Sequence, residues 1–239
     1  MTRLLFVRHG QASAGAADYD ELSPLGRAQS RRLGRWLGQR GKMPTHVLVG
    51  PRKRHRDTWT ELAAGYHEET GIVLDGAPVE SASRPLPMPA TLEALELAQR
   101  EDPLGRAARR AFSGGPGAKR AYVDLILLLL PAWARGEIGH PDVEGWDAFL
   151  ARARALINRL AEMPENANVW AITSGGLIST VIGEALGCPL DKTFELMFAT
   201  RNTAMSELSV RRAEGGPSLS LFSFNTLPHL DDEAHVTFV

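Results

Sequence analysis

Cysteine is almost absent from this chain of 239 residues, which contains only Cys188. A single cysteine cannot close a disulfide within the chain, so the sequence favours a reducing compartment and predicts a cytoplasmic protein. Cys188 directly precedes Pro189, and a small apolar side chain at the end of a predicted helix needs no chemical role. We therefore interpret Cys188 as structural.

An excess of either charge is also lacking. The chain has 27 lysines and arginines and 28 aspartates and glutamates, which gives a formal net charge of −1. Nothing in this balance favours binding to nucleic acid or to an anionic membrane, and we predict neither partner. Affinity for a phosphorylated ligand must then come from a few basic residues that the fold gathers locally.

Long apolar runs are scarce as well. The run Leu125–Ala134 is interrupted by Pro131 and is much shorter than the roughly 20 residues of a membrane span. It predicts a core helix or a contact in a homodimer. At the N-terminus, Leu4–Val7 is too short and wrongly flanked for a signal peptide, and it predicts a strand.

The sequence does contain an alternation of strand and helix patterns. Short apolar runs predict strands at Leu4–Val7, His46–Val49, Ile72–Leu74, Val169–Thr173, Ala204–Val210 and Leu219–Phe224. Amphipathic patterns and caps predict helices at Ser23–Gly41, Arg52–Tyr66, Trp146–Met163 and Gly175–Leu186. This order predicts an α/β fold, a three-layer α/β/α sandwich whose central sheet is mostly parallel.

A segment rich in proline and glycine interrupts this order between Ser81 and His140. Three prolines between Ser81 and Pro89 exclude regular structure there. Further helices are predicted at Thr91–Arg100, Leu104–Phe112 and Ala118–Arg135. We predict a single domain, residues 1–239, in which residues 81–140 form an inserted helical lobe that covers the active site and sets the substrate specificity.

Residues suited to binding a phosphate follow three of the predicted strands. The three segments are Val7-Arg8-His9-Gly10, Gly50-Pro51-Arg52-Lys53-Arg54 and Thr173-Ser174-Gly175-Gly176. They offer an imidazole beside a guanidinium, further cations, and free backbone N–H groups at a helix start. Ligands of open α/β sheets bind beyond the carboxyl ends of the strands, so we predict an anion site at this edge. No histidines or carboxylates show metal-ligand spacing, and we predict no metal.

The first segment resembles the start of the histidine phosphatase superfamily, which includes the phosphoglycerate mutases. The family's first motif is Arg-His-Gly directly after the first strand, and Leu5-Phe6-Val7-Arg8-His9-Gly10-Gln11, followed by Leu22-Ser23-Pro24-Leu25-Gly26, is similar to it. The resemblance implies that His9 takes up a phosphoryl group as phosphohistidine. It also implies that Arg8 and Gly10 help to bind the phosphate.

The family's second motif is a Ser-Pro-x-x-Arg-Ala-type segment after the second strand, and Gly50-Pro51-Arg52-Lys53-Arg54-His55 is similar to it. The resemblance implies that Arg54 is the second phosphate-binding arginine. It matches Glu80 to the family's carboxylate acid. A solvated basic face and a surface carboxylate are the alternatives for these two residues. We interpret the remaining histidines of this region, His46, His55 and His67, as structural or exposed rather than catalytic.

One position departs from the family. Where a second pocket histidine usually stands in a His-Gly-Gly-type segment, this chain has Ser174-Gly175-Gly176. A hydroxyl can donate a hydrogen bond to phosphate but cannot carry charge. We therefore predict that Ser174 binds phosphate as a neutral donor and that the activity is reduced.

The prediction is a metal-independent phosphatase without a cofactor, which hydrolyses a phosphorylated small molecule. A mutase is one alternative, although Gln11–Gly15 stands where the mutases usually have a Trp-Asn-containing segment. A phosphate-binding pseudo-enzyme with a regulatory role is the other, and Ser174 favours it. A phosphosugar, a phosphoglycerate-like acid and a phosphoprotein all stay open as substrates.

Overall fold

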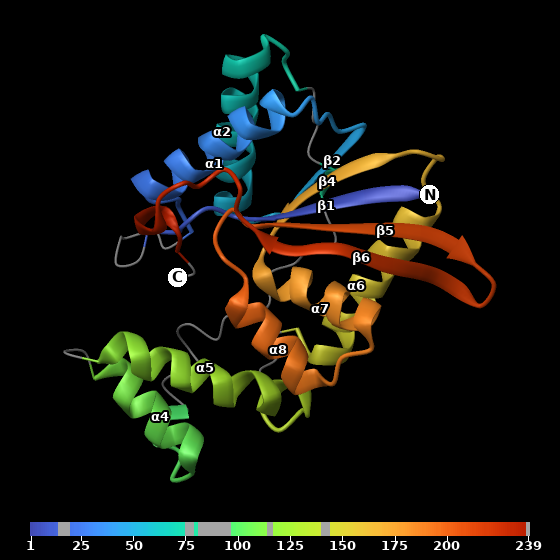
Figure 1. Ribbon diagram of the computed structural model, residues 1–239. Coiled ribbons are helices and arrows are strands. Elements are labelled where there is room, and N and C mark those ends of the chain that lie inside the picture. Colours follow the sequence, from blue (N-terminus) through green and yellow to red (C-terminus); the bar gives the residue numbers. More distant parts are fainter. Residues whose placement is uncertain (14–19, 75–78, 81–96, 114–116, 140–143, 238–239) are drawn as a thin grey trace. The chain divides into compact units, whose positions relative to one another are not determined.

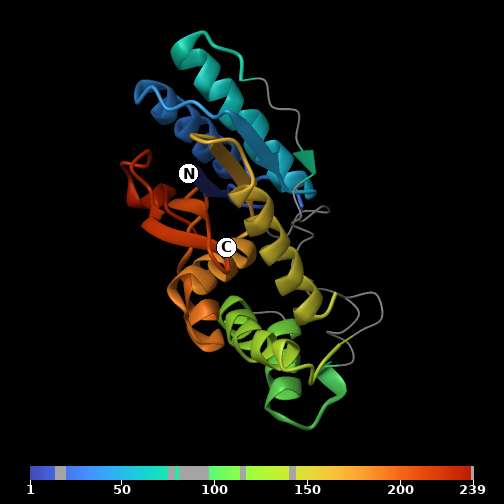
Figure 2. The same ribbon diagram turned by 90° about the vertical axis from the view of Figure 1, so that its right-hand side faces the viewer.

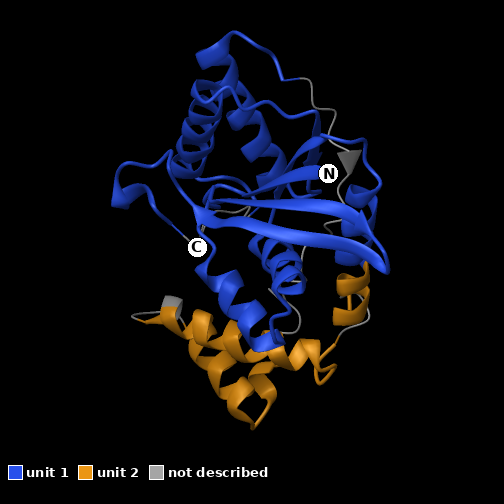
Figure 3. Ribbon diagram, turned by 45° about the vertical axis from the view of Figure 1, so that its right-hand side comes forward, with its two compact units in different colours: residues 1–85, 152–239 blue, residues 86–151 orange. Residues whose placement is uncertain are grey.

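The computed structural model describes residues 1–13, 20–74, 79–80, 97–113, 117–139 and 144–237. The chain divides into two compact units, one formed by Met1–Pro85 with Arg152–Val239 and the other by Leu86–Ala151 (Figure 3). The lobe expected at residues 81–140 falls mostly within the second unit. Its expected role as a cover of the active site stays a prediction.

The first unit is built on a sheet that has six strands among the described residues, in the order β3-β2-β4-β1-β5-β6. The strands are β1 (Thr2–Arg8), β2 (His46–Val49), β3 (Val79–Glu80), β4 (Asn168–Thr173), β5 (Met205–Ala213) and β6 (Gly216–Thr226). The pairs β1–β4, β4–β2 and β2–β3 are parallel, whereas β5 runs antiparallel to β1 and β6. The predicted parallel-rich sheet is confirmed.

Helices cover both faces of this sheet. The helices α1 (Pro24–Gln39) and α2 (Lys53–Thr70) lie over one face, and α7 (Gly175–Leu186) lies over the other with residues 152–161 of α6 (Trp146–Ala161) (Figures 1 and 2). α8 (Leu190–Ala199) follows α7, and a short 3₁₀ helix, η1 (Glu233–His235), lies near the C-terminus. The predicted three-layer α/β fold is thus confirmed.

The core shows why these strands need two helical layers. Alternate strand residues such as Val7 and Ile172 are buried in one cluster with Leu33 of α1 and Leu62 of α2. Their neighbours, such as Phe6, are equally buried but lie outside that cluster, because successive side chains of a strand point to opposite faces. Both faces of the central strands must therefore be covered.

The packing of α1 is fixed at its start and at its middle. The side chain of Ser23 caps the helix by accepting from the backbone N–H of Gly26 at 3.0 Å, as predicted. Further along, a Cβ on Gly34 would lie 1.9 Å from the carbonyl oxygen of Leu62. Only glycine lets α2 approach α1 this closely, so α2 is held in one position beside the first strand's loop.

The second unit contains α4 (Pro103–Phe112), α5 (Ala118–Ala134) and the start of α6, and residues 97–99 are also helical. Most of the apolar run in α5 is buried, and Leu127 and Leu128 are its exposed members, at 45% and 43%. The run is therefore mainly a core helix, and a homodimer contact stays a prediction. No helix in the described ranges is long and apolar enough to cross a membrane.

Three sequence expectations need correction or comment. Ile72–Leu74 is not a strand: it follows the left-handed cap at Gly71, and Ile72 and Val73 are exposed. The edge strand forms at Val79–Glu80 instead, and a strand of two residues leaves no readable periodicity. α8 was not predicted; it begins directly after Pro189. Residues 91–96 of the helix expected at Thr91–Arg100 lie outside the described residues.

Candidate active site

The three segments predicted to bind phosphate lie together at one edge of the sheet. β2, β4 and β1 are parallel neighbours, so their carboxyl ends coincide. Backbone hydrogen bonds join the segments beyond the strands: the N–H of His9 donates to the carbonyl of Thr173 at 2.9 Å, and that of Gly50 to Ile172 at 2.9 Å. The fold therefore places His9, Ser174 and the start of α2 around one site.

Strand alternation sends Arg8 and His9 in opposite directions. Arg8 points toward the start of α7, where a Cβ built on Gly175 would lie 3.7 Å from its Nε atom. His9 lies beside α2, and the next backbone N–H, that of Gly10, donates to Oγ1 of Thr58 in α2 at 3.0 Å. Two adjacent residues thus reach the site from its two sides.

The loop that carries His9 is held by contacts on two sides. The carbonyl of His9 accepts from Nδ2 of Asn202 at 3.1 Å. A Cβ on Gly10 would lie 2.5 Å from the carbonyl oxygen of Gly26, so no larger residue fits at position 10. Glycine at this position lets the loop lie directly against α1, and the predicted role of Gly10 in binding phosphate stays a prediction.

The imidazole of His9 is held as a neutral ring with one nitrogen available. Its Nδ1 lies 2.8 Å from the carbonyl oxygen of Gly10, which can only accept, so the proton belongs on Nδ1 and Nε2 keeps a lone pair. Burial, followed by the charges of Arg54 and Arg8, lowers the pKa of His9 well below its ordinary value of 6.5. A neutral imidazole with a free Nε2 is a nucleophile.

Among the basic residues at the start of α2, Arg54 is the one turned inward. Its residue exposure is 6%, whereas Arg52 and Lys53 are half-buried and Arg56 is exposed. Its Nη1 lies 3.6 Å from Oδ1 of Asp20, a residue that the sequence did not single out. Arg8 donates to the backbone carbonyl of Thr200. These contacts hold both guanidinium groups beside His9.

Ser174 does not cap α7 with its side chain, although it occupies the N-cap position. Its Oγ lies 2.8 Å from Nε2 of His55 instead. His55 is fully buried in the first turn of α2, and its ring centroid is 5.6 Å from that of His9. The site therefore contains a second imidazole, which the sequence had led us to interpret as structural or exposed.

The match to protein families agrees with this geometry. The model of the histidine phosphatase superfamily (branch 1) matches residues 4–75 and 129–223, which is more than half of the chain and includes all three strand-end segments. The chain belongs to the histidine phosphatase superfamily. No curated protein matches this histidine phosphatase.

Solved structures share its fold at low sequence identity. The mycobacterial glucosyl-3-phosphoglycerate phosphatase has a TM-score of 0.60 at 22% identity, over 95% of this chain and 99% of that one. YhfR of Bacillus stearothermophilus has a TM-score of 0.65 at 16% identity, over 96% and 99%. The phosphoserine phosphatase of Entamoeba histolytica, solved with 3-phosphoglyceric acid, has a TM-score of 0.59 at 20% identity, over 96% and 100%.

Glu80 stands apart from the other predicted site residues of this histidine phosphatase. It ends β3, where its backbone pairs in parallel with Val49 of β2, so it reaches the same edge of the sheet as the motifs. It lies outside the two segments that match the family, and its side chain lies outside what the structure describes. Its role as the acid stays a prediction.

Two departures from the family's motifs, at positions 55 and 174, together indicate His55 as a site residue. A histidine stands where the family's second motif has alanine, and a serine stands where the family usually has its second histidine. Either departure alone is unremarkable. Their connection is visible only in the fold, because His55 and Ser174 are in contact although 119 positions separate them in the chain. Asp20 gave no comparable signal, because single polar residues in loops are common, whereas Asn202 lies in the segment Arg201-Asn202-Thr203, which resembles the family's approach to its final strand.

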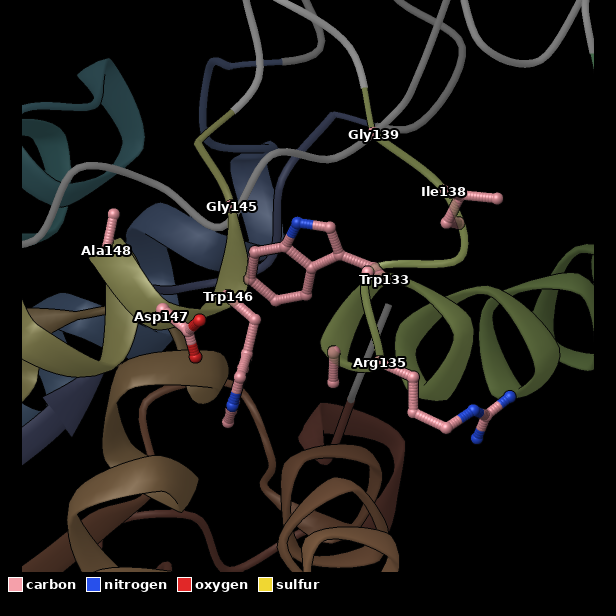
Figure 4. A pocket seen from close by; sticks show the side chains of 10 residues that line it. Trp133, Arg135, Ile138, Gly139, Gly145, Trp146, Asp147 and Ala148 are labelled. Atoms are coloured by element: carbon pink, nitrogen blue, oxygen red, sulfur yellow. The ribbon is translucent and has the colours of Figure 1, made fainter.

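A cavity of about 480 Å³ lies in the Leu86–Ala151 unit of this histidine phosphatase and contains none of the predicted site residues. Trp133 and Trp146 line it with their indole rings at 84° and 5.2 Å between centroids (Figure 4). Within the described part of the chain, no three His, Cys, Asp or Glu side chains are grouped to hold a metal ion. Beside the two indole rings, the wall includes the charged side chains of Arg135 and Asp147.

Proposed function

We propose that this histidine phosphatase hydrolyses a phosphomonoester through a phosphohistidine on Nε2 of His9. The observation that carries the proposal is the state of His9: a buried, neutral imidazole whose Nδ1 is bonded to the Gly10 carbonyl and whose Nε2 is left as a nucleophile. A surface histidine would have neither the fixed orientation nor the neighbouring guanidinium groups. The family membership of the chain supports the same chemistry.

The reaction takes two steps. Nε2 of His9 attacks phosphorus, the bond to the ester oxygen breaks, and that oxygen takes a proton from the acid, for which we propose Glu80. Water then gives its proton to the same carboxylate and attacks the phosphohistidine, which releases inorganic phosphate and restores His9. Arg8 and Arg54 bind the non-bridging oxygens, and Ser174 donates a neutral hydrogen bond to them.

The proposed substrate is a small phosphorylated metabolite. The solved neighbours include a glucosyl-3-phosphoglycerate phosphatase and a phosphoserine phosphatase bound to 3-phosphoglyceric acid, so phosphorylated small acids are the first substrates to test. A phosphoprotein is the competing class. We also propose a cytoplasmic location, since the chain has one cysteine and no disulfide to protect. We also propose a homodimer whose contact is formed by α5.

Ser174 bears on the rate. Hydrogen bonds of charged donors contribute roughly 1.5–3 kcal/mol against about 1 kcal/mol for neutral ones. A serine in place of a protonated histidine then slows the chemical step by roughly tenfold, unless another group supplies the missing interaction. The proposed enzyme is active, and it is slow where no other group supplies that interaction; turnover distinguishes it from a pure phosphate-binding module.

The deciding experiment is rapid quench with a ³²P-labelled aryl phosphate. We expect an acid-labile, base-stable label on the peptide that contains His9, and we expect His9→Ala to lower kcat at least a thousandfold, since no other group forms the intermediate. The matched control is His46→Ala, an exposed histidine at the start of β2. Full activity of folded His9→Ala protein would contradict the proposal. Isomerisation of a phosphoglycerate by wild type would favour the mutase.

A further inference from the structure

His55 is buried beside the phosphate site and next to His9. Its ring is fully buried between the loop of His9 and the end of β4, 5.6 Å from the ring of His9. Its Nε2 lies 2.8 Å from Oγ of Ser174.

The surroundings of His55 leave its hydrogen bonding centred on Ser174. Burial, followed by the charges of Arg54 and Arg52, lowers the pKa of His55 well below 6.5, although the backbone of Gly50 acts in the opposite direction. Nδ1 is buried and makes no hydrogen bond of normal geometry to any described residue. The contact with Ser174 therefore joins the ring to a side chain of the phosphate site, and the backbone of Gly50 is its other polar neighbour.

We propose that His55 positions the Ser174 hydroxyl for the phosphoryl group and thereby supplies, from helix α2, the imidazole that the family usually places at the end of β4. When phosphate is bound, its charge favours the protonated ring of His55, whose Nε2–H donates to Oγ of Ser174 while the hydroxyl proton of Ser174 is donated to a non-bridging oxygen. The proposal rests on the proposed function, because it assigns a role within the same phosphate site. His55 and Ser174 then act as one unit.

The chemistry of the pair explains why both departures occur together. Without the histidine, the serine could rotate its hydroxyl away from phosphate. The histidine itself does not reach phosphate with Nε2, because that atom contacts the serine. Linked together, the ring fixes the direction of the hydroxyl, and the charge of a bound phosphate offsets that of the arginines around the ring. The interaction expected to be missing at position 174 is in this way supplied by a neighbour.

The test compares His55→Gln with His55→Asn, and each of them with wild type. Glutamine can place its amide N–H near the position of Nε2, whereas asparagine is too short to do so. We expect His55→Asn to lower kcat/KM for p-nitrophenyl phosphate about tenfold and His55→Gln to recover most of that loss. His67→Ala, an exposed histidine on the same helix, is the control and should be unchanged. Equal losses for Asn and Gln would mean that His55 only packs, and would overturn the proposal.

A double-mutant cycle tests whether the two residues act as a unit. We expect His55→Ala and Ser174→Ala each to lower kcat/KM about tenfold and the double variant to lose no more than either single one. A roughly hundredfold loss in the double variant would overturn the proposal. Thermal unfolding of each variant identifies any that fail to fold, and the Asn and Gln pair then decides.

Ser174→His, made with and without His55, distinguishes this proposal from the alternative that the site simply lacks the family's second histidine. With His55 in place, Ser174→His should give no gain, because the ring of His55 already lies beside position 174. In a His55→Ala background, the same change should restore activity about tenfold. A gain from Ser174→His alone would overturn the proposal.

Calorimetry with inorganic phosphate keeps the two proposals distinguishable. If wild type shows no turnover but phosphate binding weakens in His55→Asn and recovers in His55→Gln, the proposed function fails and the role of His55 stands. If wild type turns over and none of the His55 variants changes kcat/KM or the phosphate Kd, the proposed function stands and the role of His55 fails.

Discussion

The loop after β1 and the first turn of α2 each bring a buried histidine to the same site, but they hold the ring by different nitrogens. In the loop, Nδ1 of His9 is bonded to the adjacent Gly10 carbonyl and Nε2 is available. In the helix, Nε2 of His55 is bonded to Ser174. Burial is the largest cause of the lowered pKa in both rings. With the roles proposed above, the difference teaches that the engaged nitrogen, rather than burial or charge, distinguishes the proposed nucleophile from the proposed positioning residue.

The charges around the two histidines are shared, and Arg54 is the clearest case. It lowers the pKa of both rings and is the inward-facing arginine of α2. Its charge therefore acts on both rings, so a substitution at position 54 tests the site as a whole.

The largest effect in this comparison is expected for Arg54→Lys. Lysine keeps the charge but loses the planar pair of donors that binds two phosphate oxygens. We expect kcat/KM for an aryl phosphate to fall by about tenfold or more, the equivalent of losing one charged hydrogen bond. Arg52→Lys is the matched control and should change kcat/KM little. Similar losses at the two positions would mean that the wrong arginine has been assigned.

A smaller effect is expected in the pH profile. Because the pKa of His9 is lowered, the ring stays neutral as the pH falls through 6.5, so kcat/KM should not decline there through protonation of His9. Arg54→Met removes the largest charge that acts on His9, so its acid limb should move to higher pH, whereas Arg54→Lys should leave the limb in place. The measurement is kcat/KM from pH 4 to 8. An unshifted acid limb in Arg54→Met would show that the charge of Arg54 does not set the pKa of His9.

The smallest effect is expected from chelation. The two rings lie 5.6 Å apart, yet the nearest ring partners are a backbone carbonyl and a hydroxyl rather than further metal ligands. Cations from arginine already provide the positive charge that phosphoryl transfer needs. Dialysis against EDTA should leave kcat unchanged within error. Activity lost on dialysis and restored by a divalent ion would show that the histidines hold a metal.

The sequence by itself determined the α/β class, most strand and helix positions, and the placement of Arg8, His9 and Arg54. Those inferences hold because they depend on neighbours in the chain: an apolar run ends, and the residues that follow it must lie at the edge of the sheet. Ser23 is of the same kind, since a helix cap is a local demand.

Only the tertiary structure decided the surroundings of the site. The contact of His55 with Ser174 spans 119 positions, and that of Asn202 with His9 spans 193. Which face of α2 turns inward depends on its packing against α1, where Gly34 admits the backbone of Leu62. A change of about 100° in helix rotation separates one residue from the next. Arg54 and His55 face the site, and Arg56 faces solvent, because α1 and the sheet fix that rotation together.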